Sequence, residues 1–154
     1  MLPIKKILFP TDFSEPSYEA LKSTDELALH FSSELVLIHV VSPVPVYATP
    51  ATSESSAGFV TSYQQEMEVH AKEALEKIVQ ERLSKGIKSQ TRVGLGDAAN
   101  EIVKTANDEN ADLIVIATHG LTGWRRFMFG SVAEKVVRLA KCPVLTIREP
   151  EGKK

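Results

Sequence analysis

The segment from Ala117 to Ser131, ATHGLTGWRRFMFGS, contains three glycines, a histidine and two threonines, and it contains no carboxylate. A strand-like apolar run precedes it, and a helical pattern begins at its end. Where glycine-rich backbone leads from a strand into a helix N-terminus, amide N–H groups can approach an anion closely. The helix dipole also favours negative charge there. The composition of this loop therefore predicts a phosphate-binding site.

The start of the helix after this loop has two interpretations. The first-turn amides of Ser131, Val132 and Ala133 lack helical acceptors, so a phosphate could accept hydrogen bonds from them and from the Ser131 hydroxyl. Alternatively, Ser131 and Glu134 form a capping box, S-x-x-E, which satisfies those donors without a ligand. A capping box would not require Gly120 upstream, and this favours the phosphate interpretation.

Five short apolar runs are predicted to be strands that position the loop. Three of them, KKILFP, ELVLIHVV and ADLIVIAT, are almost continuously apolar, as strands are when helices cover both faces of a parallel sheet. The expected strands are Ile4–Phe9, Glu34–Val40, Ile87–Val93, Asp112–Ala117 and Val144–Arg148.

Four periodic segments between these runs are predicted to be helices. Ser14 can cap the first, with Pro16 in its opening turn, and the second extends from about Thr61 to Ser84. Asp97 can cap the third, and Ser131 opens the fourth. The residues of the fourth helix expected to face inward are Val132, Val136, Leu139 and Ala140.

Strict alternation of strands and helices predicts an open, doubly wound α/β fold. We expect five parallel strands in the order 3-2-1-4-5 and four helices, a Rossmann-like arrangement. Ligands of such sheets bind at the carboxyl ends of the strands where the winding reverses, here strands 1 and 4. Strand 1 ends in Pro10-Thr11-Asp12 and strand 4 in Ala117-Thr118-His119-Gly120, so both segments should border one crevice.

Residues 42–58, SPVPVYATPATSESSAG, interrupt this pattern. Their prolines, serines and small residues are not expected to supply a core or to propagate a helix. The segment is either a tolerated surface insertion, which we favour, or a lid over the ligand crevice. We expect one domain over residues 1–150 and a short tail at 151–154.

Composition argues against several classes of partner. The chain has 154 residues and a net charge of −2, and its short basic aromatic cluster, Trp124 to Phe129, is weak evidence for nucleic-acid binding. No apolar run is long enough to cross a bilayer. The single cysteine, Cys142, fits a reducing, cytoplasmic location, and we expect it to be a small core residue.

Several familiar chemical motifs are missing. Neither a P-loop nor a G-x-G-x-x-G after strand 1 is present, and no two histidines have the spacing of metal ligands. His39 lies in an apolar strand and is expected to be a hydrogen-bonded core residue. His119 is expected to orient the loop or a phosphate rather than to act as a general base.

The motifs together resemble the universal stress protein family. The resemblance is carried by KKILFPTDFS, LIHVV, GDAANEIVKTA, ADLIVIATHGLTG and FGSVAEKVVRLAKCPVLTIR, which cover most of the chain. The nucleotide-binding branch of that family has the pattern G-x-x-G, nine residues, then G-[ST]. Gly120 and Gly130-Ser131 match this pattern, whereas Ala117 replaces its first glycine.

The resemblance implies an adenine-nucleotide site. Pro10 and Thr11 would flank the adenosine, and Asp12 would lie near the nucleotide or an attendant divalent cation such as Mg²⁺. Val40 would offer backbone groups to the adenine edge. The ribose and phosphates would lie against Ala117, Thr118, His119, Gly120, Gly130, Ser131, Val132 and Ala133. Family members also pair as dimers through the last strand, here Pro143 to Arg148.

Three functions follow, in order of preference. The first is a cytoplasmic stress-response regulator that binds ATP, ADP or AMP and hydrolyses ATP slowly at most, because the sequence has no P-loop lysine and no assigned base. The second is a nucleotide-free dimeric interaction protein of the same fold, in which Ala117 marks loss of the site. The third is an enzyme that uses Asp12 and His119 on a phosphate ester.

Overall fold

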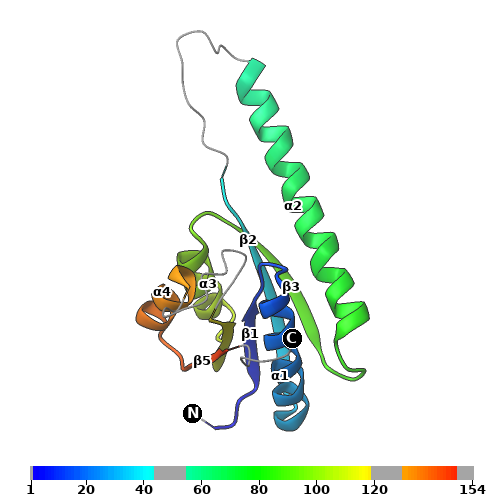
Figure 1. Ribbon diagram of the computed structural model, residues 1–154, viewed down its shortest axis with the longest axis vertical. Coiled ribbons are helices and arrows are strands. Elements are labelled where there is room, and N and C mark those ends of the chain that lie inside the picture. Colours follow the sequence, from blue (N-terminus) through cyan, green and yellow to red (C-terminus); the bar gives the residue numbers. More distant parts are fainter. Residues whose placement is uncertain (1, 44–54, 119–129, 149–154) are drawn as a thin grey trace, which may run out of the picture.

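The computed structural model describes residues 2–43, 55–118 and 130–148. Five parallel strands form one sheet in the order β3-β2-β1-β4-β5, as predicted, and helices flank it (Figure 1). The strands are β1 (Lys6–Pro10), β2 (Glu34–Val41), β3 (Ser89–Leu95), β4 (Leu113–Ala117) and β5 (Val144–Ile147). The helices are α1 (Glu15–Phe31), α2 (Ser55–Arg82), α3 (Ala98–Asp108) and α4 (Ser131–Leu139).

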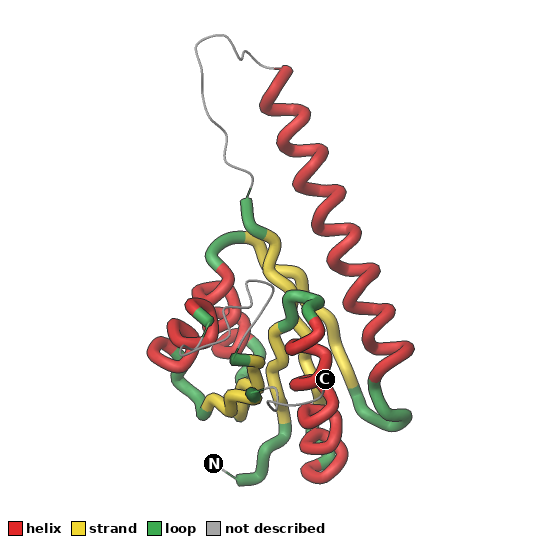
Figure 2. Tube along the Cα trace, viewed as in Figure 1, coloured by secondary structure: helices red, strands yellow, loops and turns green. Residues whose placement is uncertain are grey.

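Alternate residues of the central strands belong to two separate cores. In β1, Ile7 and Phe9 pack with residues of α1 and α2, whereas Leu8 packs with residues of α3 and α4. Figure 2 shows the two pairs of helices on opposite sides of the sheet. Because successive side chains of a strand point to opposite faces, continuous apolar runs are needed to fill both cores. This confirms the interpretation of the apolar runs as strands covered on both faces.

The predicted caps of α1 and α3 are confirmed. The Ser14 hydroxyl accepts a hydrogen bond from the Ser17 amide at 3.4 Å, and Pro16 lies in the first turn of α1. The Asp97 carboxylate accepts one from the Asn100 amide at 3.0 Å. Each side chain therefore satisfies one of the first amides of its helix, which have no acceptor within the helix itself.

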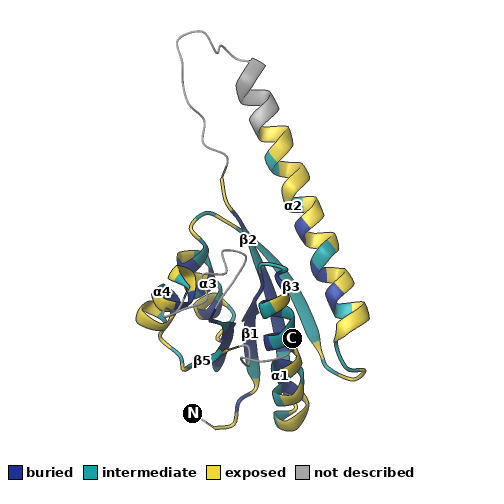
Figure 3. Cartoon of the chain, in the orientation of Figure 1, coloured by how far each residue is buried: buried dark blue, intermediate teal, exposed yellow. Residues whose placement is uncertain are grey.

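Helix α2 begins earlier than predicted and extends past the sheet. It starts at Ser55, so the end of the 42–58 segment is helical after all. Elongating an existing helix costs little per residue, even for weak helix formers. Tyr63 and Met67 are exposed, whereas Leu75 is fully buried. Figure 3 shows that the part of α2 beyond the sheet is mostly exposed where its burial is described. No helix in the described ranges, α2 included, is long and apolar enough to cross a membrane.

The predicted inward face of α4 is partly wrong. Val136 is fully buried as expected, but Val132 is 37% exposed and Leu139 is 42% exposed. Ala133 is buried in their place. Ala140 packs against the α3–α4 core as expected, so the inward face of α4 carries Ala133, Val136 and Ala140.

Candidate functional site

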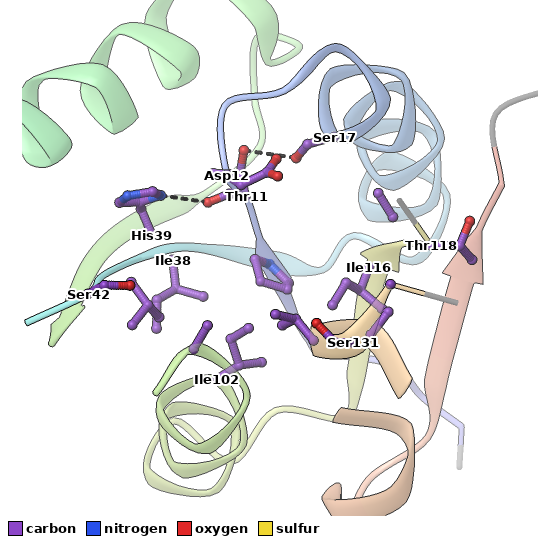
Figure 4. A pocket seen from close by; sticks show the side chains of 17 residues that line it. Thr11, Asp12, Ser17, Ile38, His39, Ser42, Ile102, Ile116, Thr118 and Ser131 are labelled. Atoms are coloured by element: carbon purple, nitrogen blue, oxygen red, sulfur yellow. Dashed lines mark hydrogen bonds between the residues drawn. The ribbon is translucent and has the colours of Figure 1, made fainter. Parts of the chain in front are cut away.

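A cavity of about 440 Å³ opens at the carboxyl ends of β1 and β4, where the winding reverses (Figure 4). Ten of the twelve predicted site residues line it, and the other two, His119 and Gly120, lie outside the described residues. The ten are Pro10, Thr11, Asp12, Val40, Ala117, Thr118, Gly130, Ser131, Val132 and Ala133. Segments far apart in the chain therefore meet at the place predicted for the crevice.

The first wall is the β1–α1 loop, which its own side chains hold in place. The Thr11 hydroxyl oxygen lies 3.0 Å from the Phe13 amide and 2.8 Å from the Ser17 hydroxyl, which both donate to it. The Asp12 carboxylate accepts from the Ser14 amide at 3.1 Å and from the Ser14 hydroxyl at 2.5 Å. Thr11 and Ser17 are buried, so the bond between their hydroxyls is shielded from water and helps to fix the loop.

The opposite wall joins the end of β4 to the start of α4. The Gly130 amide donates to the Thr118 carbonyl at 2.6 Å, and the Thr118 amide donates to the Ile147 carbonyl at 2.9 Å. These bonds fix the last residue before the 119–129 segment to the first residue after it. The wall therefore has defined geometry on both sides of that segment.

The N-terminus of α4 has no side-chain cap, so the capping-box interpretation is wrong. Gly130 is the N-cap residue, it makes no side-chain cap hydrogen bond, and Ser131 is the first helical residue instead of the cap. The first acceptor bond within the helix runs from the Glu134 amide to the Gly130 carbonyl at 3.0 Å. The amides of Ser131, Val132 and Ala133 precede it and have no acceptor in the helix.

Ala117 occupies its position without backbone strain. It is the last residue of β4 and pairs with Ile147 of β5. Among the described non-glycine residues, positive φ occurs only at Phe13, Ser32 and Asn110. An extended strand conformation suits alanine as well as glycine. The replacement of glycine by Ala117 therefore adds a methyl group to the cavity wall without distorting the backbone.

A third wall comes from β2 and from helix α3. It includes Ile38, His39 and Ile102, none of which was predicted to be a site residue. Ile38 and Ile102 form part of an apolar floor that continues the α3–α4 core. The alternation of β2 could have identified Ile38, because it lies on the same face as Val40. His39 points to the other face (Figure 4). It is half-buried at the cavity, so its predicted place in the core is wrong, although it is hydrogen-bonded as expected.

Charged groups around the cavity are few. Among the described lining residues, Asp12 is the one carboxylate and His39 the one basic side chain. Nearby, the Lys135 ammonium donates to Asp97 at 2.9 Å and, together with the Asn100 amide, holds the pKa of that carboxyl below its usual value. No group of three or more potential metal ligands occurs in the described ranges, and the role of Asp12 toward Mg²⁺ stays a prediction.

Cys142 is a packing residue. It is partly buried against the α3–α4 core, and burial raises the pKa of its thiol. A raised pKa keeps the sulfur protonated and therefore a poor nucleophile. Cys142 was expected to be a small core residue, and it is instead a partly buried residue at the edge of that core.

Comparison with known proteins connects this geometry to a family. A sequence model described as the universal stress protein family matches residues 3–148. Over 147 residues the chain is 40% identical to universal stress protein MJ0531 of Methanocaldococcus jannaschii, an overlap of 96% of this chain and 84% of that protein. The solved structure of protein MJ0577 has a TM-score of 0.80 and 31% identity, and the match covers 97% of this chain and 99% of that one.

Two more distant solved structures are complexes with a nucleotide. One is a universal stress protein in complex with cAMP, with 20% identity, a TM-score of 0.59 and coverage of 94% of this chain and 97% of that one. The other is an Arabidopsis thaliana family protein with AMP bound, with 19% identity, a TM-score of 0.59 and coverage of 96% and 93%. At these identities they support the shared fold. From the family match and the relative at 40% identity, the chain belongs to the universal stress protein family.

Proposed function

We propose that this protein binds an adenine nucleotide, ATP, ADP or AMP, in the cavity at the ends of β1 and β4, and acts as a regulator in the stress response. The observation that carries the proposal is the uncapped N-terminus of α4. Its first three residues, Ser131, Val132 and Ala133, line the cavity, and its N-cap residue, Gly130, makes no side-chain hydrogen bond to their amides. Such a terminus suits a phosphate, because its donors and its dipole both favour an anion.

The rest of the cavity suits the nucleoside. Its volume of about 440 Å³ falls within the range of small-molecule sites, about 300–1,000 Å³. Ile38, Ile102 and Ile116 line the cavity and supply an apolar surface for a base (Figure 4). Family members with cAMP and AMP indicate that the fold can accommodate this class of ligand.

The backbone of β2 offers hydrogen bonds to the base edge. Even-numbered residues of β2 bond toward β1, as the bonds from the Glu34 amide to the Lys5 carbonyl and from the Thr11 amide to the Ile38 carbonyl demonstrate. Val40 is the next residue of this series, and β1 has ended at Pro10. Its N–H and C=O therefore point toward the cavity, the position expected for groups that read the adenine edge.

Titration of the purified protein with ATP, ADP and AMP by calorimetry tests the proposal, after denaturation of a sample to look for co-purified nucleotide. We expect binding of at least one nucleotide, with Ala117→Gly binding as well or better because a methyl group leaves the wall. Absence of heat at millimolar nucleotide for both proteins would leave the alternative, a nucleotide-free interaction protein of the same fold.

We also propose that the protein forms a homodimer through β5. This strand is the edge of the sheet beside β4, and Leu145 on it is 37% exposed. An apolar edge strand is a ready template for pairing with a second chain. Light scattering should give a dimer for the wild type and a monomer for Leu145→Lys. Thr91→Lys on β3, at the opposite edge of the sheet, is the matched control and should stay dimeric.

A further inference from the structure

The pairing of β1 and β2 stops one hydrogen bond early. In a parallel ladder, the amide of Thr11 bonds to the carbonyl of Ile38, and the amide two residues later, that of Val40, would then bond to the Thr11 carbonyl. The first bond is present at 2.9 Å. The second is not, and the residues of β2 that bond to β3 are the odd-numbered ones, as the bond from the Leu35 amide to the Lys88 carbonyl demonstrates. The Thr11 carbonyl must find another donor.

That donor is His39. Its Nδ1 lies 2.8 Å from the Thr11 carbonyl oxygen. A carbonyl can only accept, so Nδ1 carries the hydrogen and the tautomer of the neutral ring is fixed. The ring also stacks on Phe13, with centroids 4.3 Å apart and planes 29° apart. Figure 4 shows the imidazole beside Thr11, on the opposite side of β2 from Ile38.

The stack with His39 also involves a residue with an unusual backbone conformation, Phe13. Its φ of 62° is a left-handed conformation that bulky residues seldom adopt. Surrounding contacts hold it in place, and they include its packing against the α1–α2 core, the bond from its amide to the Thr11 hydroxyl and the stack on His39. One side chain thus engages the loop at two points, Thr11 and Phe13.

We infer that His39 is a positioning residue for the nucleotide site. Its Nδ1–H replaces the Val40 amide as the partner of the Thr11 carbonyl, holds the β1–α1 loop away from β2, and leaves the Val40 N–H and C=O for a ligand. The base-recognition part of this inference rests on the proposed nucleotide binding. The part about the ligand-free site does not.

Two substitutions separate the contributions of the donor and the ring. His39→Asn places an amide N–H near the position of Nδ1 and removes the stack, whereas His39→Phe keeps a ring and removes the donor. His70→Gln is the matched control, because His70 is exposed on α2, far along the chain from the site. Circular dichroism and melting curves establish that each variant is folded.

Hydrogen exchange and nitrogen NMR test the ligand-free part. We expect the neutral His39 ring to be protonated at Nδ1. We also expect the Val40 amide to exchange at least about tenfold more slowly in His39→Phe than in wild type, because it can then bond to the Thr11 carbonyl. In His39→Asn the Val40 amide should exchange as in wild type. A ring protonated at Nε2, or equal Val40 exchange in all the variants, would overturn the inference.

Calorimetry with AMP and ATP tests the ligand part. We expect His39→Phe to bind about tenfold more weakly, the equivalent of one lost hydrogen bond, and His39→Asn to recover most of that loss. His70→Gln should bind as wild type. Wild-type affinity in His39→Phe would overturn the inference. If wild type itself binds no nucleotide, the proposed function fails, and the exchange experiment still decides whether His39 displaces the Val40 amide.

Discussion

Three helices begin at the cavity, and they differ in whether an N-cap side chain accepts hydrogen bonds from their first-turn amides. Ser17 of α1 and Ala98 of α3 line the cavity, as does the start of α4. The first turns of α1 and α3 are already bonded to the side chains of Ser14 and Asp97. At α4 the N-cap is a glycine, which offers no side-chain acceptor.

The difference shows where the fold leaves room for an anion. A side-chain cap typically stabilises a helix by about 1 kcal/mol, and α1 and α3 gain this within the chain itself. Helix α4 lacks such a cap at Gly130, so no N-cap side chain competes with a ligand for its first-turn donors. The capped termini thus serve stability, and the uncapped one serves recognition under the proposed function.

Capping α4 artificially should have the largest effect on binding. In Gly130→Asp, a carboxylate would accept from the first-turn amides as Asp97 does in α3, and it would repel a phosphate. We expect nucleotide affinity to fall more than about 100-fold while the melting temperature stays level or rises. Calorimetry and thermal melts measure both.

Gly130→Asn is the neutral control for that experiment. It can cap the helix without adding charge, so it should reduce affinity less than Gly130→Asp does. Unchanged affinity in the aspartate variant would mean that no anion binds at α4, and the comparison of the three termini would lose its functional meaning.

Removing a single amide donor from the start of α4 should weaken nucleotide binding less than Gly130→Asp does. Proline is well accepted at the first position of a helix, so Ser131→Pro deletes an N–H and leaves α4 intact. We expect about tenfold weaker nucleotide binding, the loss of one hydrogen bond to a charged group. Ser131→Ala, which keeps the N–H and removes only the hydroxyl, should lose less. Equal affinities for the two variants would argue against an amide contact.

Removing a cap from α1 should reduce stability. Ser14→Ala loses the acceptor for the Ser17 amide and the hydroxyl bond to Asp12, and we expect a loss of about 1 kcal/mol in the free energy of unfolding. This corresponds to a melting temperature roughly 2–4 °C lower. In contrast, Ser131→Ala should leave the melting temperature unchanged, because Ser131 does not cap α4.

The smallest expected effect is the pH dependence of the stability that the Asp97 cap gives to α3. Lys135, and then the Asn100 amide, lower the pKa of Asp97 in the folded state. A lowered pKa stabilises the fold above the ordinary aspartate pKa, and this contribution is lost as the pH falls through the lowered value. The melting temperatures of wild type and Asp97→Asn should therefore differ at neutral pH and converge as the pH falls below the lowered pKa of Asp97. A constant difference would contradict this role of the Asp97 charge.

Local signals were sufficient for much of the fold. Continuous apolar runs identified the strands because helices cover both faces, and Ser14 and Asp97 marked helix starts through short-range hydrogen bonds. The winding rule then brought Thr11 and Ala117 to one cavity. Each of these inferences depends on chain-local chemistry or on topology.

The remaining features depend on three-dimensional context. From the sequence, either Gly130 or Ser131 could be the N-cap residue of α4. In the structure Gly130 is the N-cap, and its amide bonds to the Thr118 carbonyl across the intervening segment. His39 looked like a core residue because its neighbours are apolar. Its partner, the Thr11 carbonyl, becomes available only because β1 ends before β2 does. Periodicity alone cannot show where one strand outlasts its neighbour.

The hydrogen bond between the Gly130 amide and the Thr118 carbonyl also bears on how this protein can change. It ties the two stems of the 119–129 segment together, independently of what that segment contains. Lengthening a connection whose ends are already held costs little free energy, about 0.6 kcal/mol for each doubling of its length. An insertion after the predicted site residues His119 and Gly120 and before Gly130 is therefore expected to cost little folding free energy while Thr118 and Gly130 stay joined.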